Sequence, residues 1–378
     1  MGYYGTLICR ERLRRNWSQE GLCRGICAVS YLSKIEKGRA EPSPQILQML
    51  LQRLELRTDS RLEAEAAGLA EQGRELLFTG CVDDLAELLS GGVEAFRATA
   101  SGLDLLLLEQ LSRPKGQPLD AGLEASMTPG QLALQRILQN REEEAIPLLP
   151  NAYTYTIAGQ VAYGKGSYAA AAGWLQTGYD LAAREGAPRL MLLCRLYLGN
   201  SCCNRLDVPN MLQHYAVARR LASALGDREA LEDIAYNTAS VNIETGHYEE
   251  AYTYFSSLEA PSLMALHKLA ICCEKTGRWE EALAALDRAD TLESLQPDTA
   301  LARKMCALVR FRLEQPANLA DDAYGSLLME CFEACRRQLP MGYASFHLPW
   351  VLEWLTASRQ YKRAYELLLD FPESHIYT

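Results

Sequence analysis

From residue 163 onward the chain repeats a short pattern, in which an aromatic residue stands three positions before an alanine. The four copies are Tyr168 and Ala171, Tyr248 and Ala251, Trp279 and Ala282, and Tyr361 and Ala364. A glycine stands two residues before the first three aromatics, at Gly166, Gly246 and Gly277. Apolar residues recur at helical spacing from residue 59 onward, without strand alternation. The pattern therefore predicts pairs of helices joined at the glycine, with the aromatic packed back on the first helix.

The spacing of the anchor alanines sets the number of helix pairs. The interval from Ala171 to Ala251 and that from Ala282 to Ala364 each fit two repeats of about 40 residues. The interval from Ala251 to Ala282 fits a single short repeat. The array is expected to hold about six to eight units, with degenerate copies over residues 64–112. The alternative is a generic helical bundle in which the matches arise by chance.

Charge is distributed unevenly along the chain. Residues 1–54 carry nine basic and four acidic side chains, a net charge of +5. Because the whole chain has a net charge of −10, the remainder carries −15. A basic head on an acidic body predicts that only the head contacts a polyanion. The alternative is a helical docking module whose basic surface is merely solvated.

The N-terminal segment, up to about Glu55, predicts four short helices. These are Leu7–Arg15, Gln19–Arg24, Ala28–Lys37 and Pro44 to about Leu54. Ser18 and Ser43 stand where a helix-capping side chain is preferred, and Pro44 stands at a first helical position. Gly38 is placed to end the third helix. Four short helices with one tight turn are typical of a helix-turn-helix domain.

The string WSQEGLCRGICAVSYLSKIEKGRAEPSPQIL resembles the Xre/Cro-type helix-turn-helix family. The resemblance implies that the residues facing base edges in the DNA major groove are Ala28, Val29, Ser30 and Lys34. It places at or near the phosphate backbone Gln19, Tyr31, Ser33 and Arg39. It also implies that Arg12 and Glu36 form a structural pair. Ala28 and Val29 depart from the family, which usually has a polar residue first, and they can offer only apolar contact, as to a thymine methyl.

The repeats resemble tetratricopeptide repeats, which stack as a right-handed superhelix with a concave groove. An asparagine in such a groove can both donate to and accept from one peptide unit. The candidate peptide-binding residues are Asn200, Asn204, Asn237 and Asn242. Asn200 and Asn204 share a helix face, whereas Asn237 and Asn242 lie about 140° apart on theirs. The alternative for each asparagine is solvent-exposed surface.

A helix-turn-helix head on such an array resembles the peptide-sensing, quorum-sensing regulators of Gram-positive bacteria, the PlcR-, NprR- and Rgg-like group. The resemblance implies an all-α transcription regulator with a DNA-binding domain over residues 1–58. It implies a tetratricopeptide-like superhelical domain for sensing and oligomerisation over residues 59–378. The implied partners are operator DNA, a short signalling peptide and a second copy of the chain. In the alternative, the repeat domain docks a partner protein and binds no peptide.

Other classes of function find no support in the residues. The motifs HExxH, GxxxxGK, GxSxG and GxGxxG are missing, so we expect no catalytic residue, cofactor or metal. Cysteine pairs such as Cys23/Cys27 lack a histidine at zinc-ligand spacing. The twelve cysteines lie in apolar runs and predict buried thiols in a reducing cytoplasm. The longest charge-free stretch, 145–164, is too polar for a membrane span, and the polar segment 57–60 can hold a hinge. The stretch FHLPWVLEWL, which includes Trp350 and Trp354, is a candidate dimer surface or, alternatively, the core of the last repeat.

Overall fold

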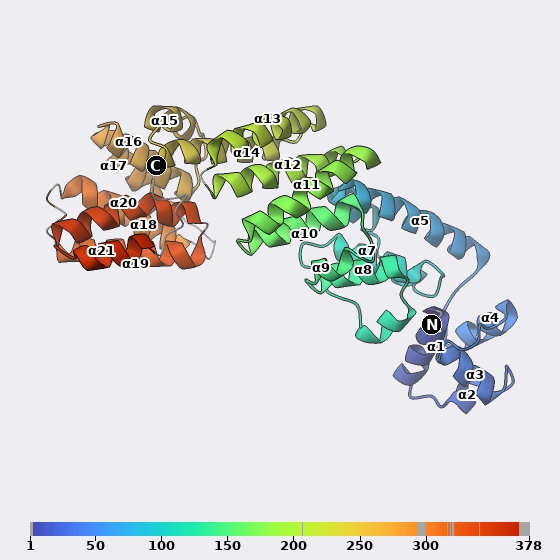
Figure 1. The fold of residues 1–378 in the computed structure, drawn as a ribbon. Helices are drawn as coiled ribbons and strands as arrows, with labels where there is room; N and C mark the ends of the chain where they lie inside the picture. Colours follow the sequence, from blue (N-terminus) through green and yellow to red (C-terminus); the bar gives the residue numbers. More distant parts are fainter. Residues whose placement is uncertain are drawn as a thin grey trace. The chain divides into compact units, whose positions relative to one another are not determined.

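A computed structural model describes residues 3–205, 207–292, 299–315, 317, 319, 321–339 and 341–369. Within these ranges the regular secondary structure is entirely helical, which confirms the predicted all-α class (Figure 1). The chain divides into two compact units, Met1–Cys194 and Arg195–Thr378. None of the helices in the described ranges has the length and apolar character needed to span a membrane.

The four head helices form where the sequence predicts them. They are α1 (Tyr3–Arg14), α2 (Gln19–Cys23), α3 (Val29–Glu36) and α4 (Pro44–Arg53). The Ser18 hydroxyl accepts from the Gly21 backbone N–H, and Ser43 caps α4 in the same way. Gly38 follows α3 with a φ of 61°, a left-handed conformation that suits glycine. Leucine and isoleucine side chains of the head helices meet in one buried core, which fixes α3 on the other three.

The rest of the N-terminal unit begins with one long helix and then becomes irregular. Its elements are α5 (Ser60–Thr79), α6 (Val82–Leu88), the 3₁₀ helix η1 (Glu94–Phe96), α7 (Gly102–Leu111), the 3₁₀ helix η2 (Ala121–Ser126), α8 (Pro129–Leu138), α9 (Glu142–Ala145), α10 (Ala152–Gly164) and α11 (Tyr168–Glu185). α12 (Pro188–Cys203) begins in this unit and ends in the next. Asp59 caps α5, as the sequence allows.

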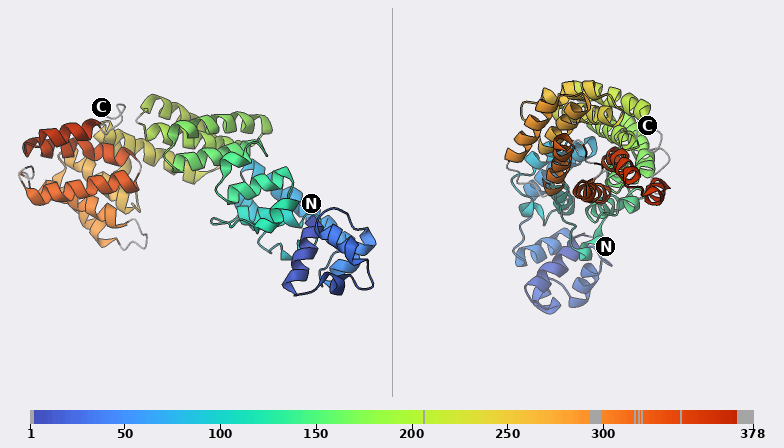
Figure 2. Two further views of the ribbon diagram at one scale, coloured as in Figure 1. Left: turned by 60° about the horizontal axis from the view of Figure 1, so that its bottom comes forward. Right: turned by 90° about the vertical axis from the view of Figure 1, so that its left-hand side faces the viewer.

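The C-terminal unit is a series of helices, each packed on its neighbours in sequence (Figure 2). They are α13 (Val208–Leu225), α14 (Arg228–Glu244), α15 (Tyr248–Ser256), α16 (Leu263–Lys275), α17 (Trp279–Thr291), α18 (Thr299–Glu314), α19 (Asp322–Gln338), α20 (Met341–Ala357) and α21 (Tyr361–Leu369). Helix α14 also contacts α20, which is distant in the sequence, so this unit curls on itself.

The repeat pattern places its glycines and alanines as predicted. Gly166, Gly246 and Gly277 sit in the turns with φ between 75° and 81°. The anchor alanines of the first three copies are fully buried, and the fourth is 9% exposed. The aromatic position behaves less uniformly. The Tyr168 ring packs on Tyr163 of the preceding helix, with 5.6 Å between centroids.

In the third and fourth copies, the prediction that the aromatic packs on the first helix was wrong. Trp279 is 55% exposed and Tyr361 is 61% exposed. In the first copy the position five residues before the aromatic holds the tyrosine on which Tyr168 packs. In these two copies that position holds Glu274 and Thr356, which offer no comparable apolar surface.

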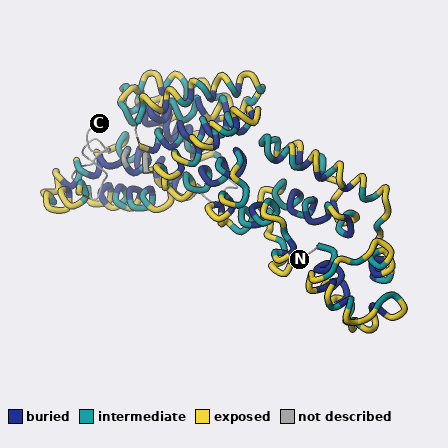
Figure 3. Tube along the Cα trace, turned by 45° about the vertical axis from the view of Figure 1, so that its right-hand side comes forward, coloured by how far each residue is buried: buried dark blue, intermediate teal, exposed yellow. Residues whose placement is uncertain are grey.

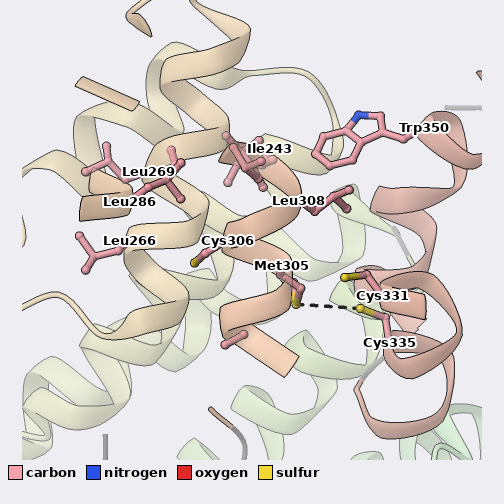
Figure 4. Close-up of a cluster of buried hydrophobic side chains, with 14 of the residues drawn as sticks. Ile243, Leu266, Leu269, Leu286, Met305, Cys306, Leu308, Cys331, Cys335 and Trp350 are labelled. Carbon is pink, nitrogen blue, oxygen red and sulfur yellow. Dashed lines mark hydrogen bonds between the residues drawn. The ribbon is translucent and has the colours of Figure 1, made fainter. Parts of the chain in front are cut away.

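The large core of the C-terminal unit joins α14 to α21 (Figure 4). It contains the thiols of Cys306, Cys331 and Cys335, and the last of these donates to the Met305 sulfur at 4.0 Å. Buried and exposed residues alternate along many of the helices, so these helices are amphipathic (Figure 3). Helix α16 is an exception, because its residues 265–273 are all buried.

Trp350 lies in this core and is only 4% exposed, with the Arg312 guanidinium 4.1 Å from its ring centroid. Trp354 packs directly over Gly325, where a Cβ atom would overlap the indole. The stretch FHLPWVLEWL is therefore the core of the last repeats, and its proposal as a dimer surface was wrong.

Candidate DNA and peptide sites

The residues predicted to contact bases lie on the exposed side of α3 and at its N-cap. Ala28, Val29, Ser30 and Lys34 are all exposed, and Val29 is 42% exposed despite its apolar side chain. Leu32 and Ile35, on the opposite side, are buried in the head core. This division follows from helical periodicity, because buried positions three residues apart leave the other face to solvent. The exposed face carries one cation and otherwise small side chains.

The orientation of α3 is set by a buried ion pair. Arg12 donates from Nε and Nη2 to the two carboxylate oxygens of Glu36, at 2.6 and 2.9 Å. The Arg12 side chain is 9% exposed and that of Glu36 is 4% exposed. Such a two-point contact fixes a helix in orientation as well as in position. The predicted structural pair is confirmed. The Gln19 amide also donates to Glu36, at 2.7 Å, so this predicted backbone-contacting residue lies beside the pair.

Only three of the nine basic residues of the head remain unpaired within the described residues. Arg10, Arg12, Arg14, Arg15 and Arg24 form ion pairs, and Arg53 donates to the carbonyls of Leu22 and Arg24. The exposed remainder is Lys34, Lys37 and Arg39, at and just beyond the end of α3. The Tyr31 hydroxyl donates to the Glu41 carbonyl at 2.9 Å and ties down the loop after Arg39, while Ser33 is half-buried. The sequence did not single out Lys37 as a candidate DNA contact, although its position between Glu36 and Gly38 places it directly after the predicted recognition helix.

In the C-terminal unit, Asn200 and Asn237 meet across two helices. The Asn237 Nδ2 donates to the Asn200 Oδ1 at 3.2 Å, and the Tyr215 hydroxyl donates to the same oxygen at 2.6 Å. Gly199 makes the close approach of Tyr215 possible, because a Cβ there would overlap the Tyr215 ring. The Asn200 Nδ2 and the Asn237 Oδ1 have no partner among the described residues. One donor and one acceptor are thus offered from neighbouring helices.

The other two asparagines are placed differently. Asn204 follows the last residue of α12 and is buried, and its Nδ2 donates to the Asn200 carbonyl at 3.0 Å. It therefore caps the end of α12. Asn242 is half-buried, and its carbonyl accepts from the His247 backbone N–H at 2.7 Å in the turn after α14. Of the four predicted residues, the structure brings three together and leaves Asn242 apart.

A buried lysine, Lys268, reaches α14 at Ser240, one turn along that helix from Asn237. Lys268 on α16 contacts the Ser240 hydroxyl, and its Nζ lies 4.3 Å from the centroid of the Tyr236 ring and 5.3 Å from that of Tyr343 on α20. Burial lowers the pKa of Lys268 to about 8. Burial also raises the pKa of Glu244 to about 7, although Lys268 opposes this shift. Sequence reasoning missed Lys268, whose one signal was a lysine inside the apolar run LMALHKLAICC.

Comparison with known proteins bears on the head. Residues 9–60 match the Helix-turn-helix family model. The N-terminal segment is a helix-turn-helix domain. The match spans α2, α3, α4 and the second half of α1. The match includes α3, whose exposed face carries the residues that the sequence predicts to contact bases.

For the remainder of the chain the comparisons are sparser. No curated protein sequence matches this chain. Among solved structures, the chain is similar to Bacillus thuringiensis PlcR, which was crystallised in complex with the peptide PapR7 and DNA. The similarity has 14% sequence identity and a TM-score of 0.32, and it covers 62% of this chain and 99% of that chain.

Proposed function

We propose that this chain is a cytoplasmic transcriptional regulator that binds operator DNA through α3 and adjusts that binding when a short peptide occupies its helical repeat domain. The observation that carries the DNA-binding part is the exposed face of α3, with Lys34, Lys37 and Arg39 at its end. These three cations form no ion pair among the described residues, whereas five arginines of the head do. Phosphate contacts from such cations supply affinity, and base-edge contacts supply specificity. Residues 1–58 serve as the DNA-binding domain in this proposal, and residues 59–378 serve in sensing and oligomerisation.

DNA binding is tested by selecting bound duplexes from a random pool and measuring affinity for the best site. Lys34→Ala is expected to weaken binding by about 1–3 kcal/mol if Lys34 contacts a base. Affinity is expected to fall steeply with salt, because each phosphate contact releases counterions. Lys362→Ala is the matched control, since Lys362 is 89% exposed in α21 and pairs only with Glu366 among the described residues. Binding that is independent of salt, or no selected sequence at all, contradicts the proposal.

The peptide-binding part rests on the Asn200–Asn237 contact. The free donor of Asn200 and the free acceptor of Asn237 match the carbonyl and N–H of one peptide unit. An extended backbone can pair with this edge without any requirement on its side chains. The buried Lys268 of α16 contacts Ser240, which lies one turn along α14 from Asn237, and adds a polar group beside the two asparagines.

The peptide site is tested by adding short peptides from the host's secreted pool to the protein–operator complex. Asn237→Ala is expected to abolish the change in operator affinity and to leave binding without peptide unaltered. Tyr215→Phe is the matched control. It also removes one hydrogen bond to the Asn200 Oδ1, from a buried side chain, but it leaves the donor of Asn200 and the acceptor of Asn237 in place. If Asn237→Ala responds like wild type, the site is misassigned. If no peptide alters DNA binding, the repeat domain instead docks a partner protein.

A further inference from the structure

The outer side of α1 is fastened to the helices that follow the head. The Tyr3 hydroxyl donates to the Arg97 carbonyl at 2.6 Å, and the Arg97 guanidinium lies 3.2 Å from the Glu11 carboxylate. The Glu11 side chain is 8% exposed and that of Arg97 is 20% exposed, so water screens this pair little. Ala98 is buried in the core of the head itself.

The segment between head and body is fastened as well. The sequence allows a hinge at residues 57–60, but Glu63 of α5 binds both sides of it. Its carboxylate accepts from the Tyr4 hydroxyl at 2.9 Å, from the Thr58 hydroxyl at 3.0 Å and from the Ala100 backbone N–H at 3.0 Å. A free hinge at this segment is therefore excluded in the conformation described.

The inner side of α1 is fastened to α3. Arg12, the neighbour of Glu11, holds Glu36 at the last turn of α3. Near the start of α1, Gly5 lies so close to α3 that a Cβ would overlap the Ile35 carbonyl oxygen. These two contacts leave little room for α1 and α3 to shift separately.

We infer that α1 is the mechanical link between the helical body and the recognition helix, with Glu11 held by Arg97 of the body and Arg12 held by Glu36 of α3. A displacement of the 94–100 segment reaches α3 through two adjacent side chains of one helix. A surface pocket of about 210 Å³ lies beside this segment, and Glu94, Arg97 and Leu7 are among the residues that line it. This inference adds a route of regulation to the proposed function, and it rests on that function only for its effect on DNA.

The link is tested by amide hydrogen exchange in the full-length protein. Arg97→Gln removes the guanidinium from Glu11 and is expected to speed exchange in both α1 and α3 by about tenfold, because opening of α1 then costs less. Arg113→Gln is the matched control, since Arg113 is 54% exposed and pairs only with Glu109 among the described residues, and it should leave both helices unchanged. Faster exchange confined to residues 94–102, with α3 as in wild type, overturns the link.

A milder variant guards against global unfolding. Tyr3→Phe deletes one hydroxyl and its bond to the Arg97 carbonyl. If Arg97→Gln loses helical circular dichroism, Tyr3→Phe decides by the same criterion: exchange that rises in both α1 and α3 supports the link, and unchanged α3 overturns it. A separate gel shift with wild-type protein and random-sequence duplex tests DNA binding. A failure there removes the proposed function while the exchange result still decides the link.

Discussion

Arg12 meets Glu36 through two hydrogen bonds in a place where neither side chain reaches much water. The sequence could predict this pair, because the family resemblance fixes both positions. It could not predict that Gln19 also donates to Glu36, since that contact depends on the angle between α2 and α3. The same limit applies to Asn200 and Asn237, which are far apart in the sequence and meet only through the packing of their helices.

Removing one partner of the Arg12–Glu36 pair leaves a buried charge. Glu36→Ala is expected to lower the free energy of opening of α1 and α3 by about 3–5 kcal/mol. Amide hydrogen exchange of the full-length protein measures this. Glu20→Ala is the control, because Glu20 is 74% exposed and lies 3.8 Å from Arg24, and it should cost less than about 1 kcal/mol. Lost DNA binding with unchanged exchange makes Glu36 part of the DNA interface instead.

Two buried histidines predict an acid-sensitive fold. His267 and His347 stack with 6.4 Å between ring centroids, and neither ring nitrogen of His267 has a hydrogen-bond partner within the described part of the chain. Burial lowers the pKa of His267 well below 6.5, with further lowering from His347 and Lys268, and burial lowers the pKa of His347 to about 4. Each neutral histidine therefore contributes stability that is present above pH 6.5 and is lost as the pH falls below it.

His267→Phe keeps a ring of similar shape and removes both unpaired nitrogens. Relative to wild type, the variant should gain about 1.4 kcal/mol of unfolding free energy for each pH unit below 6.5. Urea unfolding at pH 7, 6 and 5.5 measures the difference. Glu244 acts in the opposite direction, because its raised pKa makes its contribution to the unfolding free energy fall as the pH rises through about 7. This contribution is the same in wild type and in His267→Phe, so it cancels in the difference between them. A difference that does not change with pH shows that His267 does not titrate on unfolding.

At the scale of helices, the capping side chains and the turn glycines made the helix ends predictable from the sequence. Ser18, Ser43 and Asp59 begin their helices as their side chains allow, and Gly38 ends α3. The region between α5 and α10 was less predictable. Its two 3₁₀ helices and the single-turn α9 lack the long periodicity that makes a helix recognisable, and tertiary packing decides their ends.

Two glycines, one in a turn and one inside a helix, test whether Gly246 is required by its turn. Gly246 has a φ of 81°, which strains any L-residue, so Gly246→Ala should destabilise the C-terminal unit by about 1 kcal/mol. Gly173 lies on the exposed side of α11, and a Cβ there meets open space. Gly173→Ala should therefore stabilise its helix by about 0.5–1 kcal/mol. Thermal melts of both variants give the two signs, and equal signs refute the assignment.

At the scale of the whole molecule, a single head covers only half of a two-fold operator. We expect the chain to act as a homodimer, and sedimentation of the full-length protein with operator DNA should then give a protein mass of twice 42.1 kDa. The basic head repels its own copy, so the helical body is the expected contact. The stretch around Trp350 is not available for it, because that side chain is buried. A protein mass of one chain, with and without DNA, contradicts the dimer.

The two-sided attachment of α1 has a consequence for exchanging parts between regulators. A helix-turn-helix domain looks like a module that recombination could replace at its last residue. In this chain a joint at residue 58 would separate Tyr3, Tyr4 and Glu11 from Arg97 and Glu63, their partners beyond the joint. A foreign head would fold but would lack these contacts with the body. A chimaera that changes DNA specificity while keeping control by the body should instead retain α1 and replace only residues 17–53.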